Sequence, residues 1–215
     1  MSGNYIYLHG FASSPRSAKA QYLRDRFQTL QINLQLLDLN QGDFTHLTLT
    51  RQIQQVLRVI AAQSGAITLI GSSFGGLTAA WVAQQLQVQP QLQRLVLLAP
   101  AFGFPANWLA KLSPEALQQW QSERYLSVYH YGEVRSLPLN YAFVTDASQY
   151  DEAQLQHRIP TLILHGHYDH VIPIQASRDY AAQRPWVKLI ELDSDHTLGN
   201  VQSQIWDAIW TFCRD

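Results

Sequence analysis

A serine between two glycines stands where an apolar run gives way to a helical stretch of small residues. The segment Gly71-Ser72-Ser73-Phe74-Gly75 matches the pattern G-x-S-x-G, with Ser73 at its centre. At a sharp strand-to-helix turn, glycines in these two places avoid clashes, and the turn exposes the serine hydroxyl beside a helix N-terminus. The pattern predicts nucleophilic attack by Ser73. A Gly-Ser turn without chemistry is the competing interpretation.

A serine nucleophile needs a base, and the base needs a carboxylate that orients it. His196 lies in a polar loop after the apolar run 187–192, and Asp169 lies in the loop after the run 162–164. Because the carboxyl ends of parallel strands meet at one edge of a sheet, both side chains should lie near Ser73. We therefore predict a catalytic set of Ser73, His196 and Asp169.

Other acidic residues compete for the role of Asp169. Asp195 adjoins His196 and cannot easily turn to its Nδ1 atom, and Asp193 is similarly close in sequence. Asp146 follows a short strand predicted over residues 141–144 and stays as the alternative acid.

Histidines around Asp169 raise the alternative of a metal site. They are His165, His167 and His170, and the sequence offers no second cluster of ligands. Since alternate residues of a strand share a face, we expect His165 to support the loop. The glycine-rich segment after residue 70 also fails as a phosphate loop, because no lysine follows its last glycine. We expect neither a metal nor an organic cofactor.

Serine chemistry on an acyl group also needs donors for the developing oxyanion. One is expected to be the backbone N–H of Phe74, the residue after the nucleophile. The second should come from a loop after an early strand, and Tyr7-Leu8-His9-Gly10-Phe11 supplies one with the Phe11 N–H. His9 could act as a second base, but we favour a supporting role for it in that loop.

Short apolar runs alternate with helical patterns over most of the chain. Continuous apolar runs are typical of strands covered on both faces, and strand-helix alternation predicts a doubly wound, mostly parallel α/β sheet of about six strands. Helical periodicity is expected over residues 53–60, 75–86 and 201–212. The predicted strands are Tyr5–Leu8, Ile32–Leu37, Ile67–Ile70, Leu95–Leu98, Leu162–Leu164 and Val187–Leu192.

Residues 101–158 are too many for a single crossover. We interpret them as a mainly helical insertion that covers the strand ends, within one domain of residues 1–215. Ser113-Pro114 predicts a helix start there. A substrate pocket would be lined by the apolar residues Trp108, Leu109, Leu112 and Trp120. An extra helix packed on the core is the alternative interpretation of these side chains.

Composition excludes several classes of protein. The net charge is −1, with 15 basic and 16 acidic residues, which leaves no basic face for nucleic acid and no membrane anchor. One cysteine, Cys213, cannot form an internal disulfide, and the N-terminus lacks the pattern of a signal peptide. We expect a cytoplasmic protein. Its oligomeric state stays open.

The motifs together resemble the α/β-hydrolase superfamily. More narrowly, the segments Tyr7–Pro15 and Gly71–Gly76 resemble those of the small bacterial YqiA/UPF0227-type esterases. The resemblance spans nearly the whole chain and is weakest over residues 101–158. It implies a Ser-Asp-His hydrolase that acts on carboxylic esters or thioesters. One departure is that the chain starts at the strand before the Phe11 loop, without the antiparallel strands that open many members of the superfamily.

The sequence therefore favours hydrolysis of small acyl esters through an acyl-enzyme. Two alternatives stay open, because a fold and a catalytic set do not determine the substrate. The same residues could serve acyl transfer or C–C bond hydrolysis, and a catalytically silent protein could use this fold to bind a ligand.

Overall fold

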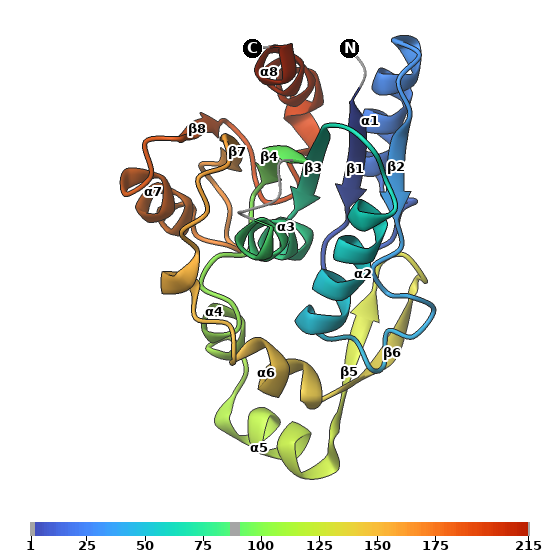
Figure 1. Cartoon of the computed structure of the whole chain (residues 1–215). Helices are drawn as coiled ribbons and strands as arrows, with labels where there is room; N and C mark the ends of the chain where they lie inside the picture. Colours follow the sequence, from blue (N-terminus) through green and yellow to red (C-terminus); the bar gives the residue numbers. More distant parts are fainter. Residues whose placement is uncertain (1–2, 87–90, 215) are drawn as a thin grey trace.

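A parallel sheet forms the centre of the molecule. The computed structural model describes residues 3–86 and 91–214 of the chain. Within them, six parallel strands are arranged in the order β2-β1-β3-β4-β7-β8 (Figure 1). These strands are β1 (Asn4–Leu8), β2 (Leu34–Leu37), β3 (Ile67–Ser72), β4 (Leu92–Leu98), β7 (Thr161–Gly166) and β8 (Val187–Leu192). The predicted α/β sheet is confirmed, and β2 and β8 form its edges.

Helices cover both faces of this sheet, which explains why its strands are apolar on both sides. On β1, Ile6 and Leu8 belong to the core beneath α2 and α3, whereas Tyr5 and Tyr7 belong to the core beneath α1 and α8. Side chains alternate between the faces because successive residues of a strand point in opposite directions. The covering helices are α1 (Ala18–Thr29), α2 (Leu49–Ala61), α3 (Phe74–Gln85), α7 (Ile174–Ala182) and α8 (Gln202–Arg214).

The insertion lies below the carboxyl ends of the strands in the view of Figure 1. Its first long helix begins as predicted, since Ser113 Oγ accepts a hydrogen bond from the Ala116 amide (3.2 Å) and Pro114 is the first helical residue. Its elements are α4 (Ala106–Leu109), α5 (Pro114–Glu123), β5 (Tyr125–His130), β6 (Arg135–Asn140), α6 (Ala142–Ala147) and the short 3₁₀ helix Glu152–Gln154.

The insertion differs from the sequence prediction at two places. Residues 125–140 form an antiparallel hairpin of β5 and β6, which was not predicted, beside the helices of the insertion. The strand predicted over residues 141–144 is wrong, because that segment starts helix α6. Long-range contacts hold the hairpin: the Tyr131 amide donates to Ala12 O (2.8 Å), and the Asn140 amide donates to Thr45 O (2.9 Å). Local periodicity cannot predict such anchors.

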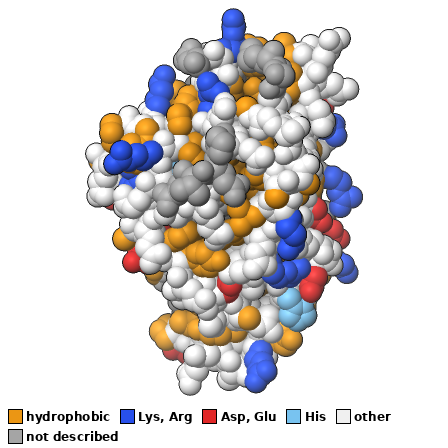
Figure 2. Space-filling view, viewed as in Figure 1, with side chains coloured by type: hydrophobic (Ala, Val, Ile, Leu, Met, Phe, Trp, Pro, Cys, Tyr) orange, Lys and Arg blue, Asp and Glu red, His pale blue; other side chains and the backbone are white. Residues whose placement is uncertain are grey.

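Charged side chains are sparse on the molecule, as only 14% of the residues are Asp, Glu, Lys or Arg. On the face shown in Figure 2, blue and red side chains are scattered among uncharged atoms. Among the described residues, no helix is both long and apolar enough to cross a membrane.

Candidate active site

The turn at Ser73 joins β3 to α3 with a strained backbone. Ser73 has φ 53° and ψ −117°, a region that residues with a side chain rarely adopt. Two hydrogen bonds join its backbone to β4 and the loop after it: its amide donates to Leu98 O (2.8 Å), and its carbonyl accepts from the Ala101 amide (3.1 Å). A Cβ atom at Gly75 would clash with the Leu8 carbonyl. The glycine thus allows the turn to press against β1, which presents the serine hydroxyl at the sheet edge.

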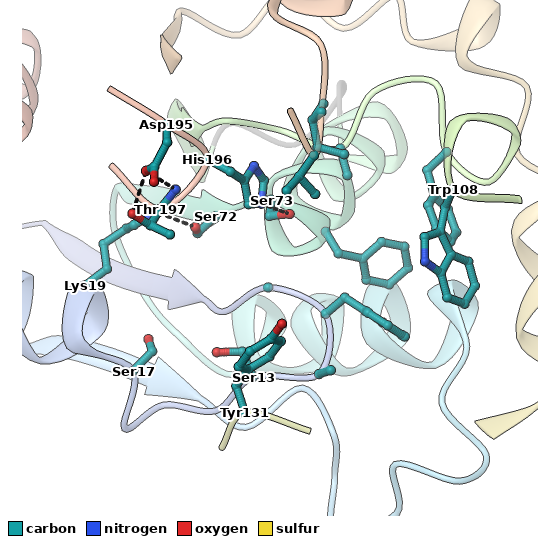
Figure 3. A pocket seen from close by; sticks show the side chains of 18 of the residues that line it. Ser13, Ser17, Lys19, Ser72, Ser73, Trp108, Tyr131, Asp195, His196 and Thr197 are labelled. Atoms are coloured by element: carbon teal, nitrogen blue, oxygen red, sulfur yellow. Dashed lines mark hydrogen bonds between the residues drawn. The ribbon is translucent and has the colours of Figure 1, made fainter. Parts of the chain in front are cut away.

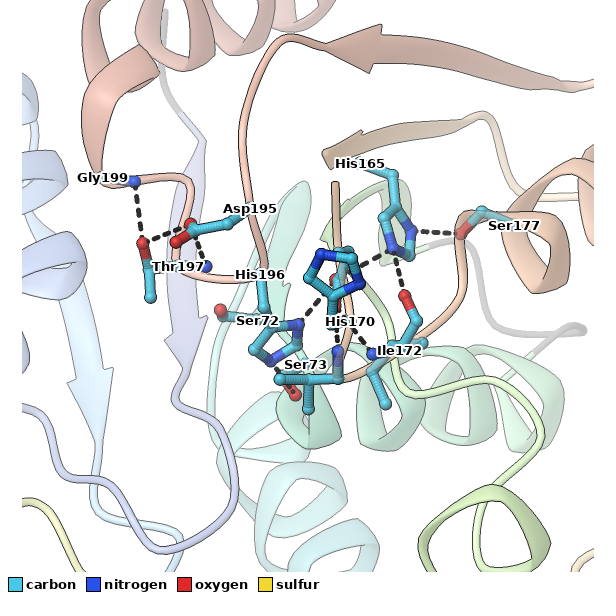
Figure 4. A network of polar contacts seen from close by, with 12 residues as sticks. Ser72, Ser73, His165, His170, Ile172, Ser177, Asp195, His196, Thr197 and Gly199 are labelled. Atoms are coloured by element: carbon cyan, nitrogen blue, oxygen red, sulfur yellow. Dashed lines mark hydrogen bonds and ion pairs between the residues drawn. The ribbon is translucent and has the colours of Figure 1, made fainter. Parts of the chain in front are cut away.

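His196 lies between Ser73 and Asp169. Its Nε2 atom is 3.1 Å from Ser73 Oγ, and its Nδ1 atom is 2.7 Å from Asp169 Oδ2 (Figure 4). An ionised carboxylate can only accept hydrogen bonds, so the Nδ1 atom carries the proton and donates a hydrogen bond to Asp169. Nε2 is then free to accept a hydrogen bond from the Ser73 hydroxyl. The structure therefore brings together the three residues that the sequence singled out, in an order that allows proton transfer from serine to histidine.

Asp169 is buried, yet it is held in its charged form. Burial acts to raise the pKa of its carboxyl group, but hydrogen bonds from His165 and His196 and the amide of Ile172 hold that pKa well below its ordinary value. The side chain of Asp169 is fully buried, whereas 22% of the His196 side chain is exposed. A permanently charged acid beside a histidine stabilises the imidazolium that forms when the histidine takes a proton.

His165 has a more direct role in this network than its sequence position suggested. Its Nε2 atom lies 3.1 Å from Asp169 Oδ2, and its Nδ1 atom lies 2.8 Å from Ser177 Oγ. Since Nε2 faces a carboxylate, it donates, and Nδ1 accepts from the Ser177 hydroxyl. His165 therefore helps to orient Asp169 by binding Oδ2, the same carboxylate oxygen that His196 binds (Figure 4).

The loops that carry Asp169 and His196 are joined through their backbones. The His167 amide donates to Leu192 O (2.9 Å), and the Tyr168 amide donates to Ser194 O (3.0 Å). A Cβ atom at Gly166 would clash with the carbonyls of Ser194 and Asp195. The missing side chain at Gly166 therefore lets the two loops approach closely enough for the acid to reach the base.

Phe11 and Phe74, whose amides the sequence predicts as oxyanion donors, both lie at the cavity over Ser73. Both residues line the same cavity as Ser73, and a Cβ atom added to the neighbouring Gly10 would lie 3.9 Å from Ser73 Oγ. In the described part of the chain, neither amide donates to another backbone group. The oxyanion role of the two amides stays a prediction.

His9 is occupied by backbone partners and does not serve as a second base. Its Nε2 atom accepts from the Leu39 amide (2.9 Å), so the proton lies on Nδ1, which donates to Gly10 O (2.8 Å). Asp38 lies 3.5 Å from Nε2, beyond a good hydrogen bond. Because the Gly10 carbonyl and the Phe11 amide belong to one peptide unit, His9 holds the orientation of the Phe11 N–H.

The other candidate acids form hydrogen bonds with residues other than His196. Asp146 Oδ2 accepts from the Thr50 amide (3.0 Å) at the start of α2. Asp195 accepts from the amide and the hydroxyl of Thr197, and the Asp193 carbonyl accepts from Asn200. Asp169, rather than any of these, is the carboxylate that meets His196.

The histidines around Asp169 lie in different surroundings. His165 is buried, His167 faces Glu191 with 3.3 Å between Nδ1 and Oε2, and His170 lies at the cavity wall. Over residues 3–86 and 91–214, no three His, Cys, Asp or Glu side chains gather in an arrangement that could hold a metal ion.

A cavity of about 840 Å³ opens over Ser73 and His196 (Figure 3). This volume falls within the range of about 300–1,000 Å³ that small-molecule sites have. One part of the wall is aromatic: Trp108 lies 5.4 Å from Phe11 and 5.8 Å from Phe104, measured between ring centroids. Trp108 thus lines the cavity as expected.

The other three predicted pocket residues lie behind that wall. Trp120 is 1% exposed, packs edge-on against Trp108 and donates its indole N–H to Leu139 O (2.9 Å). Leu109 and Leu112 pack against the same hydrophobic core. Trp120 therefore supports Trp108 in place of lining the cavity, whereas Leu109 and Leu112 are partly buried against the core outside the cavity wall.

Sequence reasoning missed Lys19. Its ammonium group lies 3.1 Å from Ser72 Oγ and lines the cavity next to the nucleophile. Burial lowers its pKa to about 8, and the nearby carboxylates of Asp169 and Asp195 oppose that change. A lysine in the first turn of a surface helix carries no local signal that it faces inward, so only the packing of α1 on the sheet reveals it.

Comparison with known proteins agrees with this geometry. Residues 4–213 match the family described as Uncharacterised protein family (UPF0227). The chain belongs to this family. A search of curated protein sequences finds no match. The family assignment agrees with the resemblance seen in the sequence around Phe11 and Ser73.

Solved structures share the fold of this member of UPF0227. Alpha/beta hydrolase domain-containing protein 10 from mouse matches with a TM-score of 0.80 at 21% identity, covering 100% of this chain and 89% of the other. Est1E from Butyrivibrio proteoclasticus, with bound ferulic acid, matches with 0.82 at 19% identity, covering 100% and 90%. A monoacylglycerol lipase from Paleococcus ferrophilus matches with 0.77 at 16% identity, covering 99% and 97%. The fold is that of the α/β-hydrolases.

Proposed function

We propose that this protein is a serine hydrolase that cleaves carboxylic esters of small substrates. The observation that carries the proposal is the position of His196, 3.1 Å from Ser73 Oγ and 2.7 Å from Asp169 Oδ2. Similarity in fold to an esterase that binds ferulic acid and to a monoacylglycerol lipase supports this reaction class.

The geometry supports a two-step reaction. Ser73 Oγ attacks the acyl carbonyl while its proton passes to His196 Nε2, and the Phe11 and Phe74 amides stabilise the oxyanion. The intermediate collapses, the ester C–O bond breaks, and the leaving alcohol takes the proton from His196. Water then attacks the acyl-enzyme and gives a proton to His196, which returns it to Ser73 as the carboxylic acid leaves.

The aromatic part of the cavity is suited to the acyl chain. Phe11, Phe74, Phe104 and Trp108 give it an apolar wall directly beside the nucleophile. Each methylene group buried against such a wall contributes about 0.8 kcal/mol. We therefore assign the acyl group to this side and the leaving group to the opposite side of Ser73.

Covalent labelling tests the proposal. A fluorophosphonate probe should modify Ser73, identified by mass spectrometry of the labelled peptide, and Ser73→Ala should abolish the labelling. The same protein should hydrolyse p-nitrophenyl butyrate. Absence of both labelling and hydrolysis would favour a silent binding protein. Labelling with transfer to an added alcohol in place of water would indicate acyl transfer.

A further inference from the structure

The wall of the cavity changes in character on the two sides of Ser73. Trp108 and its aromatic neighbours lie on one side, and Lys19, Ser17 and Thr197 lie on the other (Figure 3). The catalytic steps described above use none of these polar side chains. Their position beyond the nucleophile, away from the aromatic wall, is where the leaving group of an ester would extend.

Lys19 is an unusual residue to place in such a wall, because even a partly buried ammonium group is costly unless it is well paired. Ser72 Oγ, at 3.1 Å, is its one hydrogen-bond acceptor among the described residues. An ammonium group has three N–H donors, so two are left over. Asp195, which also lines the cavity, accepts hydrogen bonds on Oδ1 from the amide and the hydroxyl of Thr197 and none from Lys19.

Other charges do not replace the missing partner. No ion pair joins Lys19 to Asp195 or Asp169 in the part of the chain that the structure describes, although both carboxylates act on it at longer range. The second lysine of the cavity, Lys111, has its ammonium bound to the carbonyls of His170 (3.1 Å) and Val171 (2.8 Å). Lys19 thus has two donors left for a ligand, whereas Lys111 has one.

We propose that Lys19 binds an anionic group, a carboxylate or a phosphate, on the leaving-group side of the ester substrate. This inference rests on the proposed function and narrows its substrate class to esters with an apolar acyl chain and an anionic leaving group. The two N–H donors of Lys19 would form charge-assisted hydrogen bonds to that anion, which are about twice as strong as neutral ones.

Matched substrates test the proposal. All are butyrate esters of phenols: 4-(carboxymethyl)phenyl butyrate, 4-(phosphonomethyl)phenyl butyrate and the neutral 4-(methoxycarbonylmethyl)phenyl butyrate. The methylene group keeps the acidity of the three phenols similar. In the wild-type protein, kcat/KM for at least one anionic ester should exceed that for the neutral ester. Lys19→Met should lower the anionic-to-neutral ratio roughly ten- to a hundredfold, as expected for hydrogen bonds to a charged group.

Two variants separate charge recognition from a structural role. Lys19→Arg keeps the charge and should retain most of the anionic preference. Lys111→Met removes the other cavity lysine and should leave the anionic-to-neutral ratio unchanged. A loss of the preference in Lys111→Met but not in Lys19→Met would overturn the proposal, and so would an equal loss of both activities in Lys19→Met with Lys19→Arg unimpaired.

The pH dependence gives an independent readout. Because the pKa of Lys19 is lowered to about 8, its charge should disappear as pH rises through that value, and the anionic preference should decline with it. Asp169 and Asp195 favour the charged form of Lys19, whereas Tyr7, whose pKa burial raises to about 12, stays neutral there. Any pH dependence of the catalytic steps that the esters share cancels in the ratio. A ratio that is constant from pH 7 to 10 would contradict the proposal.

The outcomes also distinguish this inference from the function on which it rests. Cleavage of the neutral ester without any anionic preference overturns the role of Lys19 alone. No cleavage of any of the three esters by the wild-type protein overturns the proposed function as well. A faster reaction with the carboxylate or with the phosphonate assigns the site to that group.

Discussion

Two regions of the molecule place side chains around the cavity in different ways. The loops at the carboxyl edge of the sheet hold Ser73, Asp169 and His196, each after its own strand. The insertion, residues 101–158, supplies Trp108 and the hairpin of β5 and β6. Residues of the first region meet because parallel strands end at a common edge, whereas residues of the second meet through packing between distant segments.

The difference shows which sequence signals are local. A strand followed by a polar loop predicts where a side chain emerges, since the sheet sets the position of every strand end. No regular sheet sets the position of an aromatic residue in the insertion. Trp108 and Trp120 are both apolar residues of short helices, yet the first lines the cavity and the second is 1% exposed.

The sharpest way to test the sheet-edge region is to remove its nucleophile. Ser73→Ala should lower kcat/KM for p-nitrophenyl butyrate by roughly 10³-fold or more, because the catalytic residues act as a unit. Ser72→Ala is the control, and its effect should be far smaller since Ser72 Oγ contacts Lys19 and not His196. A larger loss for Ser72→Ala would show that the turn presents the other serine.

Changing the acid should have the next largest effect. Asp169→Asn should lower the rate by on the order of 10²- to 10³-fold while the protein stays folded, because His196 loses the carboxylate that orients it. Asp146→Asn is the matched control at the alternative acid; it weakens the bond to the Thr50 amide, so about 1 kcal/mol of stability and little activity should be lost. Steady-state kinetics and thermal unfolding of both variants decide the assignment.

The aromatic wall should affect chain-length preference more modestly. In the wild-type protein, kcat/KM for p-nitrophenyl esters should rise from acetyl to a short or medium acyl chain and then fall as the apolar space fills. Trp108→Ala enlarges that space and should move the optimum to longer chains, with changes of roughly tenfold for individual esters.

Trp120→Phe tests whether Trp120 and Trp108 have different roles in the insertion. It removes the hydrogen bond to Leu139 O and should lower stability by about 1 kcal/mol without moving the chain-length optimum. If Trp120→Phe shifted the optimum and Trp108→Ala did not, the two tryptophans would have exchanged roles.

The smallest expected effect concerns pH and the start of the insertion. Glu152 accepts hydrogen bonds from the Gly103 amide, and burial raises its pKa to about 7 although these bonds oppose the change. When the pKa of a carboxyl group is higher in the folded than in the unfolded protein, proton binding to that group stabilises the fold. The contribution is fully present below the pKa of the unfolded protein, near 4.5, and is lost as pH rises through about 7.

Glu152→Gln should therefore be more stable than the wild type by about 1 kcal/mol above pH 7, and the difference should vanish below pH 4.5. Thermal unfolding from pH 4 to 9 measures it. A stability gap that widens toward low pH would contradict this account, and esterase activity at fixed temperature serves as the control for an intact site.

Local sequence patterns account for the fold class, the order of the strands along the chain and the glycine-flanked turn at the nucleophile. Glycines 71 and 75 bracket Ser73, the run before Asp169 is apolar enough to be the buried strand β7, and the run before His196 forms the edge strand β8. Each of these signals is carried by neighbouring residues, because backbone conformation and strand burial are local properties. Even His9 could be placed beside Phe11 from its position at the end of β1.

Which side chains line the cavity depends on packing between distant segments. Lys19 faces Ser72 because α1 packs on the sheet, and Trp120 turns away because Leu139, nineteen residues later, accepts its indole N–H. The hairpin of the insertion depends on bonds to Ala12 and Thr45, far earlier in the chain. Contacts between residues distant in sequence leave no periodic pattern, since each depends on how two separately formed elements are brought together.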